Sequence, residues 1–372
     1  MGRTRIRSKK TSVSGTSEND GPSIEALFTK AQSLLTQCEY DLAQNFAFRI
    51  LQRAPGNVEA KELLGVTQLE KGQLEEAKET FQSLLPPVPG APNSPPPSAH
   101  LYLAQLSEDD PHAALEHYGR AVTLLHGQLK GKERAIVENS GETELDIRRN
   151  IVRVLVAMVE IWMSPEYDLC DDPRAEETCE ALFKSAFETD SDNVEALICL
   201  SSFRLSQQRP EEAKEAAMKA WSSSKDDEDD SKSLPLSIRI ELAKRFIELS
   251  DFSHALVVLQ SIMALDDQEV MAWYLQGWCL FLMAEQAKET GTKSEELSWE
   301  DLAKDARECL ENCKTLYVSL EYPDEGLLQH TIEVIGQLDT LGIRPRAADE
   351  DVDGPEGEWE DVEESDEDVE MS

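Results

Sequence analysis

The 372-residue sequence predicts an all-α protein built from repeated helix pairs, and two observations carry this prediction. Apolar residues recur with the helical period almost everywhere between the two ends of the chain, without a convincing alternating strand pattern. The tetrapeptide Asn-Val-Glu-Ala at residues 57–60 recurs at residues 193–196, an offset of 136 residues that equals four times 34. A period of 34 residues therefore organises the chain.

Thirty-four residues is the length of the tetratricopeptide repeat, a helix-turn-helix unit with small residues where its two helices cross. In the clearest copy Gly65 takes the small position of the first helix and Gly72 the turn. Ala77 takes the small position of the second helix, and Phe81 fills the space between the helices. Only Gly or Ala lets two helix backbones approach closely at such a crossing, so these residue types fit the repeat for a physical reason.

The other copies are degenerate but follow the same pattern. The first copy has Ala31 and Ala43 at the two small positions and ends at Pro55, because proline cannot continue a helix. Later second helices show a face of small and apolar residues, namely Ala114, Tyr118 and Ala121; Cys179, Phe183 and Ala186; Ala213, Ala217 and Ala220; and Ala255, Leu259 and Ile262. We expect a superhelix of about six or seven divergent helix pairs.

The last copy is longer than the others. It begins around Trp273 and Gly277, but its second helix, near Ala306 and Leu310, lies 29 residues after Gly277 where the usual spacing is 12. Either a helix is lengthened or a loop is inserted. An amphipathic stretch at residues 324–341 then predicts a capping helix, which a repeat array needs to keep its end soluble.

Composition divides the chain into three parts. We expect a disordered basic arm at residues 1–22, the repeats at 23–346 and a disordered acidic tail at 347–372. Within the repeats we expect a proline-rich loop at 86–98 and an acidic loop at 222–233. The basic side chains of the arm are Arg3, Arg5, Arg7, Lys9 and Lys10.

The net charge excludes several classes of function. The chain has 74 acidic and 36 basic side chains, a formal net charge of −38 and a sequence pI of about 4.4. A surface this negative repels phosphate backbones and anionic lipids, so we expect no direct nucleic-acid partner, no membrane partner and a basic protein as ligand. With 40% hydrophobic residues the chain can still bury a core.

The sequence predicts neither an enzyme nor a metal protein. It contains no Walker loop, Rossmann glycine fingerprint, serine elbow or zinc-protease motif, so we expect no catalytic residues and no cofactor. His112 and His117 fall on different helix faces, and Cys309 and Cys313 have no second pair nearby, so we expect no metal and buried packing cysteines. The seven cysteines lack disulfide-framework spacing and no signal peptide precedes them, which favours the cytoplasm and nucleus.

We expect the binding surface on the concave face, which the first helix of each pair lines. With Gly65 as the eighth position of its repeat, three of the four concave positions of that copy are acidic. The corresponding positions of the last copy are Met271, Tyr274, Trp278 and Leu282, an aromatic and apolar patch. The candidate binding residues are Glu59, Glu62, Glu70, Glu195, Glu248, Tyr274 and Trp278.

Two interpretations of this pattern are open. A groove with carboxylates at one end and aromatic rings at the other suits an extended Lys/Arg-rich segment with a few apolar side chains. Alternatively, Tyr274 and Trp278 pack against the capping helix. Some co-chaperones clamp a terminal carboxylate with Lys and Asn at these positions, where the clearest copy has Glu59, Glu62, Val66 and Glu70 instead, so carboxylate clamping is disfavoured.

The whole chain resembles the fungal assembly chaperones of the fourth large-subunit ribosomal protein. The resemblance rests on the basic start at residues 2–10, the divergent repeats with Asn-Val-Glu-Ala, the closing helix, and the tail sequence Glu-Trp-Glu-Asp-Val at residues 358–362. It implies a dedicated, non-catalytic chaperone that captures a newly made basic ribosomal protein through a long internal loop of that client. Such a chaperone would keep the client soluble and accompany it to the nucleus, with a nuclear import receptor as a further partner and the chain acting as a monomer.

Other functions and features stay open on the sequence alone. Some acidic nuclear tetratricopeptide proteins bind histones, and the acidic run at residues 226–230 suits that function, whereas a neutral scaffold would leave the charge of −38 unexplained. The segment Arg3–Lys10 is either a nuclear-import signal or a solvated or RNA-tethering terminus. Ser365 is followed by three acidic residues, which suits modification by an acid-directed kinase, or it is an unmodified serine.

Overall fold

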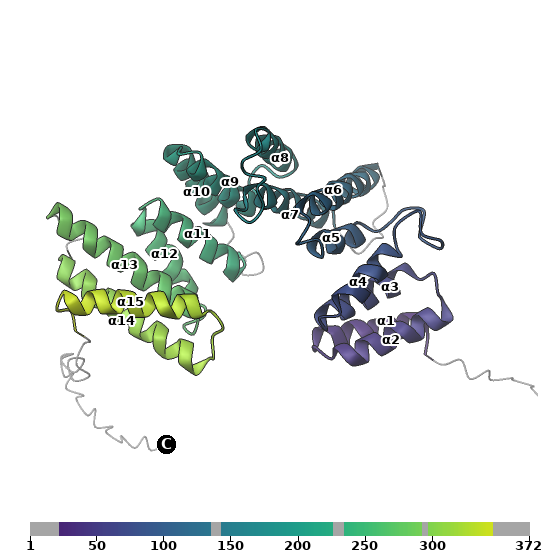
Figure 1. Ribbon diagram of the computed structural model, residues 1–372, viewed down its shortest axis with the longest axis horizontal. Helices are drawn as coiled ribbons and strands as arrows, with labels where there is room; N and C mark the ends of the chain where they lie inside the picture. Colours follow the sequence, from purple (N-terminus) through teal and green to yellow (C-terminus); the bar gives the residue numbers. More distant parts are fainter. Residues whose placement is uncertain (1–21, 135–142, 226–233, 292–296, 345–372) are drawn as a thin grey trace, which may run out of the picture. The chain divides into compact units, whose positions relative to one another are not determined.

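The computed structural model describes residues 22–134, 143–225, 234–291 and 297–344 (Figure 1). These residues contain fifteen α-helices and no β-strand, which confirms the predicted all-α fold. The predicted acidic tail lies outside the described residues, as does the predicted basic arm except for Pro22.

The chain forms two compact units, residues Met1–Ala196 and Leu197–Ser372, and each is described by itself. The helices of the first unit are α1 (Ile24–Thr36), α2 (Tyr40–Arg53), α3 (Val58–Glu70), α4 (Leu74–Gln82), α5 (Pro97–Gln105), α6 (Pro111–Arg134), α7 (Glu144–Met163) and α8 (Ala175–Thr189). The helices of the second unit are α9 (Val194–Ser206), which begins just before the boundary, α10 (Pro210–Lys225), α11 (Leu236–Glu248), α12 (Phe252–Met263), α13 (Val270–Thr290), α14 (Trp299–Ser319) and α15 (Glu325–Thr340).

Consecutive helices pack as pairs. Helix α1 contacts α2, α3 contacts α4, α5 contacts α6 and α7 contacts α8 in the first unit, and α11 contacts α12 and α13 contacts α14 in the second. Helices α9 and α10 are joined where the buried Ser201 hydroxyl donates a 2.7 Å hydrogen bond to the carbonyl of Ala213. The described residues therefore form seven pairs with α15 as an additional helix, the upper end of the predicted number.

The recurring tetrapeptide marks the start of a helix. The side chain of Asn57 accepts a hydrogen bond of 2.7 Å from the backbone N–H of Ala60, and that of Asn193 accepts one of 3.1 Å from Ala196. Such an N-cap satisfies one of the backbone donors that a helix start leaves unpaired. Helices α3, α9, α11 and α13 all begin at the first position of the repeat register counted from the sequence.

The small residues lie where helices cross, as predicted. A Cβ atom added to Gly65 would come within 2.6 Å of the ring of Phe81, which is fully buried. A Cβ atom added to Gly277 would come within 2.7 Å of the side chain of Leu310. In both pairs the close approach of the two helices depends on glycine.

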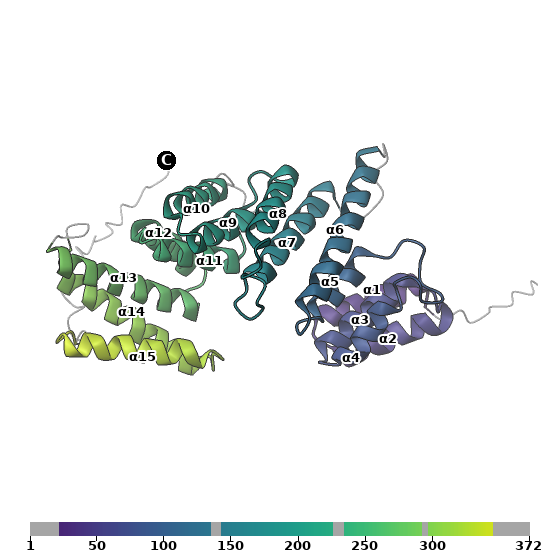
Figure 2. The same ribbon diagram turned by 45° about the horizontal axis from the view of Figure 1, so that its top comes forward.

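The last pair is lengthened in both of its helices. Helices α13 and α14 have 21 residues each, against 13 in α3 and 9 in α4. This settles the open alternative for the 29-residue spacing, although the connection at residues 292–296 lies outside the described residues. Helix α15 is the predicted capping helix, and α13, α14 and α15 lie side by side in both views (Figures 1 and 2).

Two predicted loops are shorter in the structure. The proline-rich loop was predicted to end at residue 98, but Pro97 and Ser98 begin α5, because proline is compatible with the first helical position. The acidic loop was predicted to begin at Ser222, but α10 continues to Lys225. The Ser222 hydroxyl donates to the carbonyl of Lys219 at 2.9 Å and so satisfies its polar group within the last turn. Residues 226–233 lie outside the described part of the chain.

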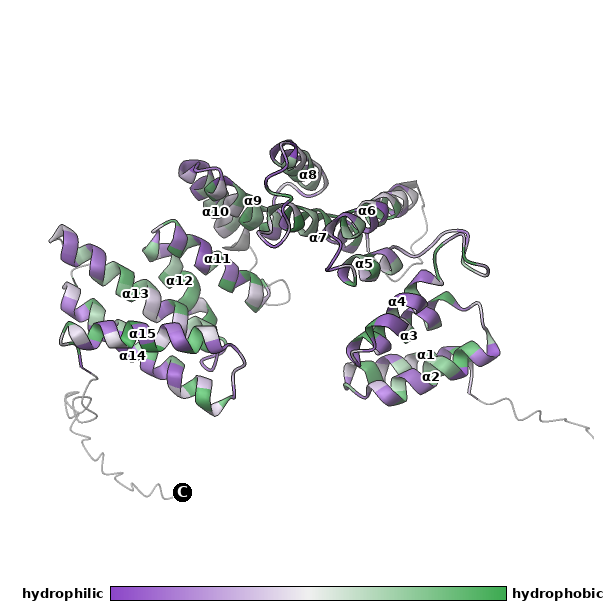
Figure 3. Ribbon diagram, viewed as in Figure 1, coloured by the Kyte–Doolittle hydropathy of each residue, from purple (hydrophilic) through white to green (hydrophobic). Residues whose placement is uncertain are grey.

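Each helix carries both hydrophilic and hydrophobic residues (Figure 3), and the buried hydrophobic side chains form the core of each unit. The predicted packing cysteines Cys309 and Cys313 are buried, and burial raises the pKa of their thiols to about 12 and about 11. Among the described residues, no His, Cys, Asp and Glu side chains gather in a group of three that could hold a metal ion. In the same residues no helix combines the length and the apolar character that a membrane span requires.

Candidate functional site

Helix α3 presents three carboxylates on one face. Glu59, Glu62 and Glu70 are separated by three and then eight residues, so they lie above one another along the helix. Glu59 and Glu70 are exposed, whereas Glu62 is half-buried. In the described part of the chain no Lys or Arg nitrogen forms an ion pair with any of the three.

Glu62 is the most constrained of these carboxylates. Its side chain accepts a hydrogen bond from the hydroxyl of Ser98, at the start of α5. Burial raises the pKa of Glu62, the Ser98 hydrogen bond opposes that shift, and the charge of Glu59 adds to it. Among the described residues Glu62 is therefore a half-buried carboxylate next to a second negative charge, without a cation that would stabilise its ionised form.

Two tyrosines flank the carboxylates. Tyr102 of α5 stacks on Phe81 with the ring centroids 4.6 Å apart, and its pKa is raised by burial first and then by the charges of Glu62 and Glu70. The pKa of Tyr40 at the start of α2 is raised to about 12, chiefly by a hydrogen bond with Cys38, and Glu70 contributes to the shift.

We call the surface formed by Glu59, Glu62, Glu70, Ser98 and Tyr102 the α3 carboxylate face. Carboxylates next to an aromatic ring attract and orient cationic side chains. This combination is suited to a Lys or Arg side chain of a partner.

The other two predicted acidic residues are already neutralised. Glu195 forms an ion pair of 3.2 Å with Arg153 of α7, and Glu248 forms one with Arg245, whose side chain is buried. The Arg153 partner could not be predicted from the sequence, because it lies 42 positions from Glu195. The Glu195 pair joins two helices and the Glu248 pair lies within α11, and both carboxylates are weaker candidates for binding a partner.

The predicted aromatic residues contact the capping helix. The hydroxyl of Tyr274 lies 2.9 Å from Nδ1 of His330 on α15, and the rings of Trp278 and His330 meet edge to face with centroids 4.7 Å apart. Trp278 also stacks on Phe281 at 5.6 Å. The interpretation in which these rings pack against the capping helix is confirmed. A groove that joins them to the α3 carboxylate face stays a prediction.

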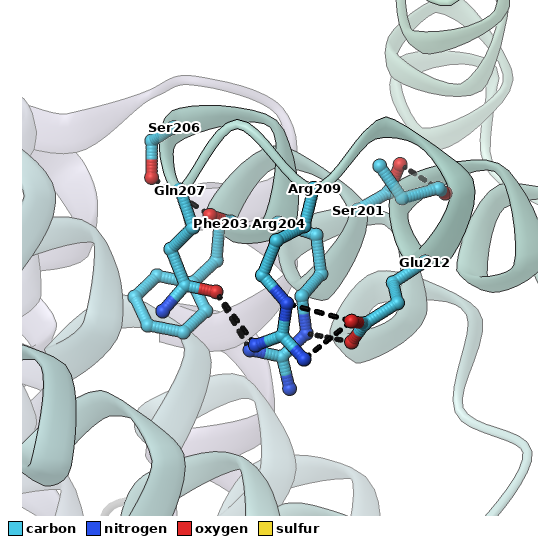
Figure 4. Close-up of polar contacts among 8 residues, drawn as sticks. Ser201, Phe203, Arg204, Ser206, Gln207, Arg209 and Glu212 are labelled. Carbon is cyan, nitrogen blue, oxygen red and sulfur yellow. Dashed lines mark hydrogen bonds and ion pairs between the residues drawn. The ribbon is translucent and has the colours of Figure 1, made fainter.

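Two polar clusters have no counterpart in the sequence analysis. At the turn between α9 and α10 (Figure 4), Arg204 and Arg209 both contact the carboxylate of Glu212, with Arg204 Nε at 3.3 Å, and Arg204 also donates to Gln207 at 2.8 Å. The turn itself has Gln208 in the left-handed region at φ 59°. The ion pairs and hydrogen bonds of this cluster therefore stabilise the turn between α9 and α10.

The second cluster lies between α5 and α6. Nδ1 of the buried His100 is 2.9 Å from Nδ1 of His117. From the sequence, His117 was a candidate metal ligand only together with His112. The pKa of His100 is lowered to about 4, by burial and then by the neighbouring His117, and that of His117 is lowered as well. Two neutral imidazoles fit this geometry when the Nδ1–H of one donates to the unprotonated Nδ1 of the other. The two histidines are 17 positions apart, so no local sequence pattern indicates the pair.

Comparison with known proteins identifies close relatives. Residues 28–93 match the family model for the tetratricopeptide repeat. A Schizosaccharomyces pombe protein named "Probable assembly chaperone of rpl4" is 32% identical over 310 residues, which cover 81% of this chain and 85% of that protein. An Emericella nidulans protein of the same name is 28% identical over 383 residues, which cover 97% of this chain and 93% of that protein.

One solved structure supports the same relationship. It is that of residues 1–338 of the assembly chaperone of RpL4, Acl4, with 27% sequence identity and a TM-score of 0.59. The match covers 73% of this chain and all of that structure. The resemblance expected from the repeats and the two ends of the sequence is thereby confirmed.

Proposed function

The chain belongs to the family of Rpl4 assembly chaperones, and we propose that it binds the newly made fourth protein of the large ribosomal subunit and keeps it soluble before assembly. The relatives are named for Rpl4, which identifies the proposed client. The net negative charge of this chain indicates how a basic client would be bound. A ribosomal protein without its RNA has many uncompensated positive charges, and a chain of net charge −38 offers a temporary counterpart. This role requires binding and no catalytic residue.

The observation that carries the proposal is the α3 carboxylate face. Its three glutamates lack ion-pair partners in the described residues, whereas Glu195 and Glu248 have them. Across water at ~4 Å one ion pair contributes only about 1 kcal/mol, so affinity has to come from many contacts. We therefore expect fast capture, strong salt dependence, and release when RNA competes for the client.

The transport steps form a separate part of the proposal. The chain would accompany its client from the cytoplasm to the nucleus as a monomer, with the segment Arg3–Lys10 recognised by an import receptor. Fusion of residues 1–20 to a fluorescent reporter tests this directly. Nuclear accumulation of the reporter supports the signal, and an even distribution removes it from the proposal.

We further propose that Ser365 in the acidic tail is phosphorylated and tunes client affinity. A phosphate would add about −1.5 to −2 charges to a segment with 14 acidic residues and no basic one, which is a small fractional change. Mass spectrometry of the protein from its host measures the occupancy. A tenfold or larger loss of affinity in the Ser365→Ala variant, about 1.4 kcal/mol, would contradict a tuning role.

The experiment that tests the proposed function is a binding assay with full-length chain and purified Rpl4 at low and moderate salt. We expect the wild type to bind Rpl4 in preference to histones, and charge reversal of Glu59, Glu62 and Glu70 to Lys to abolish binding. Deletion of residues 349–372 should only weaken binding, because this segment of 14 acidic and no basic residues contributes net charge outside the α3 carboxylate face. Equal losses from the two changes, or preference for histones, would contradict the proposal.

A further inference from the structure

A cavity of about 400 Å³ opens at one end of the second unit, between α13, α14 and α15. Its floor is apolar and includes the buried side chains of Phe281, Ala303 and Leu338. The half-buried ring of Trp299 and the exposed side chain of Leu341 stand at its edge. The volume lies in the range of pockets that hold a ligand or a large side chain.

The lengthening of the last helix pair creates this cavity. A 13-residue helix that began at Val270, like α3 at Val58, would end at Leu282. The wall formed by Ala284 to Glu289 therefore belongs to the turns that the last repeat adds. Helix α15 has only 16 residues and ends at Thr340, which leaves the added turns partly uncovered.

The rim of the cavity is charged. Nζ of Lys288 lies 4.8 Å from the ring centroid of Trp299, so the face of this ring already receives a cation. The exposed Glu285 and Glu289 flank the lysine on the same helix. Helices α13, α14 and α15 together carry ten acidic and four basic side chains.

This charge distinguishes between the candidate occupants. The acidic tail of the same chain begins shortly after Leu341, but its residues 349–372 have 14 acidic and no basic side chains. Like charges would repel it from the acidic helices. A segment with Lys or Arg on either side of one apolar residue matches both the acidic rim and the apolar floor.

We propose that this cavity is a second client site, which takes one apolar side chain from a basic segment of the ribosomal protein. The inference rests on the proposed function and deepens it, because it assigns the client a shape-specific contact in the second unit in addition to the charge contacts of the α3 carboxylate face. The lengthened helices of the last repeat then have a role in recognition.

Site-specific photo-cross-linking in the full chain tests the assignment. A benzophenone amino acid replaces Leu341, which lines the cavity and is 38% exposed, or Ile332, which lies on α15 outside the lining and is 50% exposed. With purified Rpl4 we expect an adduct to the client from position 341 and none from 332. Equal yields from the two positions, no adduct from 341, or an adduct from 341 to the tail of the chain would overturn the inference.

Affinity measurements provide the second test. We expect Glu285→Lys combined with Glu289→Lys to weaken Rpl4 binding about tenfold, and Glu333→Lys, a charge reversal on α15 outside the cavity, to change it less than twofold. If the wild type binds Rpl4 and the double variant binds equally well, this inference is wrong and the proposed function stands. If the wild type does not bind Rpl4, the proposed function is wrong, and the inference that rests on it is wrong as well.

Discussion

The first helices α3 and α13 occupy equivalent places in their repeats but use their equivalent residues differently. On α3, Glu62 lies half-buried beside Ser98, and no Lys or Arg of the described segments pairs with it. On α13, Tyr274 and Trp278 are contacted by His330 of the capping helix. A place in the repeat therefore does not fix the contacts of a side chain: Tyr274 and Trp278 pack against another helix, whereas Glu62 receives a hydroxyl donor but no cation among the described residues.

The acidic residues show the same difference. Glu248 and Glu195 each pair with an arginine, whereas Glu59 and Glu70 have no such partner in the part of the chain that the structure describes. An unpaired carboxylate keeps its full capacity for a partner's cation, and a paired one has to lose an existing contact first. The comparison reduces the acidic candidates to the α3 carboxylate face.

The largest effect that we expect concerns pH and the first unit. The pKa of His100 is lowered from 6.5 to about 4, so the unfolded chain takes up a proton in that interval while the folded chain does not. The stability due to neutral His100 is present above pH 6.5 and is lost as pH falls toward 4, about 3 kcal/mol in unfolding free energy. Hydrogen exchange should show α5 and α6 losing protection before α13 to α15.

The pH dependence of the unfolding free energy isolates the contribution of His100. The His100→Gln variant should lose about 3 kcal/mol less than the wild type between pH 7 and pH 4, and the exposed His112→Gln should behave like the wild type. His117 acts in the same direction as His100, while Glu62, whose folded pKa is raised, acts in the opposite direction. Identical slopes for the wild type and His100→Gln would show that the buried imidazole does not control acid stability.

The second prediction compares paired and unpaired carboxylates directly. Reversal of Glu59 and Glu70 to Lys should weaken Rpl4 binding about a hundredfold, or about 2.7 kcal/mol, because each change replaces attraction by repulsion at the site. Reversal of Glu195 and Glu248 should weaken binding less than threefold. Calorimetric titration at fixed ionic strength measures both variants, and equal losses would mean that net charge alone determines affinity.

The third prediction concerns the aromatic residues of the second unit. The Trp278→Ala variant should lose about 2 kcal/mol of unfolding free energy, less than a fully buried tryptophan would, because its ring is half-buried. Rpl4 affinity should stay within twofold. Urea denaturation followed by titration of the folded variant checks both values, with Trp278→Phe as the conservative control. Unchanged stability with weakened binding would instead make Trp278 a client contact.

Much of the fold could be predicted because the repeat is encoded locally. A helix crossing is indicated by the residue types of Gly65 and Phe81, or of Gly277 and Leu310. A helix start is indicated by Asn57 and by its counterpart Asn193. The loop boundaries at Pro97 and Ser222 could not be predicted, since proline and serine suit a loop and also a helix end.

The site was only partly accessible from the sequence. Concave carboxylates could be located by counting, but whether they are paired depends on contacts between distant residues, such as Arg153 with Glu195 or Ser98 with Glu62. The pair of His100 and His117 and the contact of His330 with Trp278 likewise join separate helices. Residue type and spacing say nothing about such partners.

The central claim is that the client binds the half-buried carboxylate of α3, which has no cation partner among the described residues. Its most direct test is a paired measurement of stability and affinity on Glu62→Gln. The folded pKa of Glu62 is raised, so its stabilising contribution is present below its ordinary pKa and is lost as pH rises through the folded pKa. At pH 7.5 the variant should therefore unfold at a higher urea concentration than the wild type while binding Rpl4 about tenfold more weakly. The exposed control Glu79→Gln on α4 should change neither value, and a Glu62→Gln variant that is less stable or binds with unchanged affinity would contradict the claim.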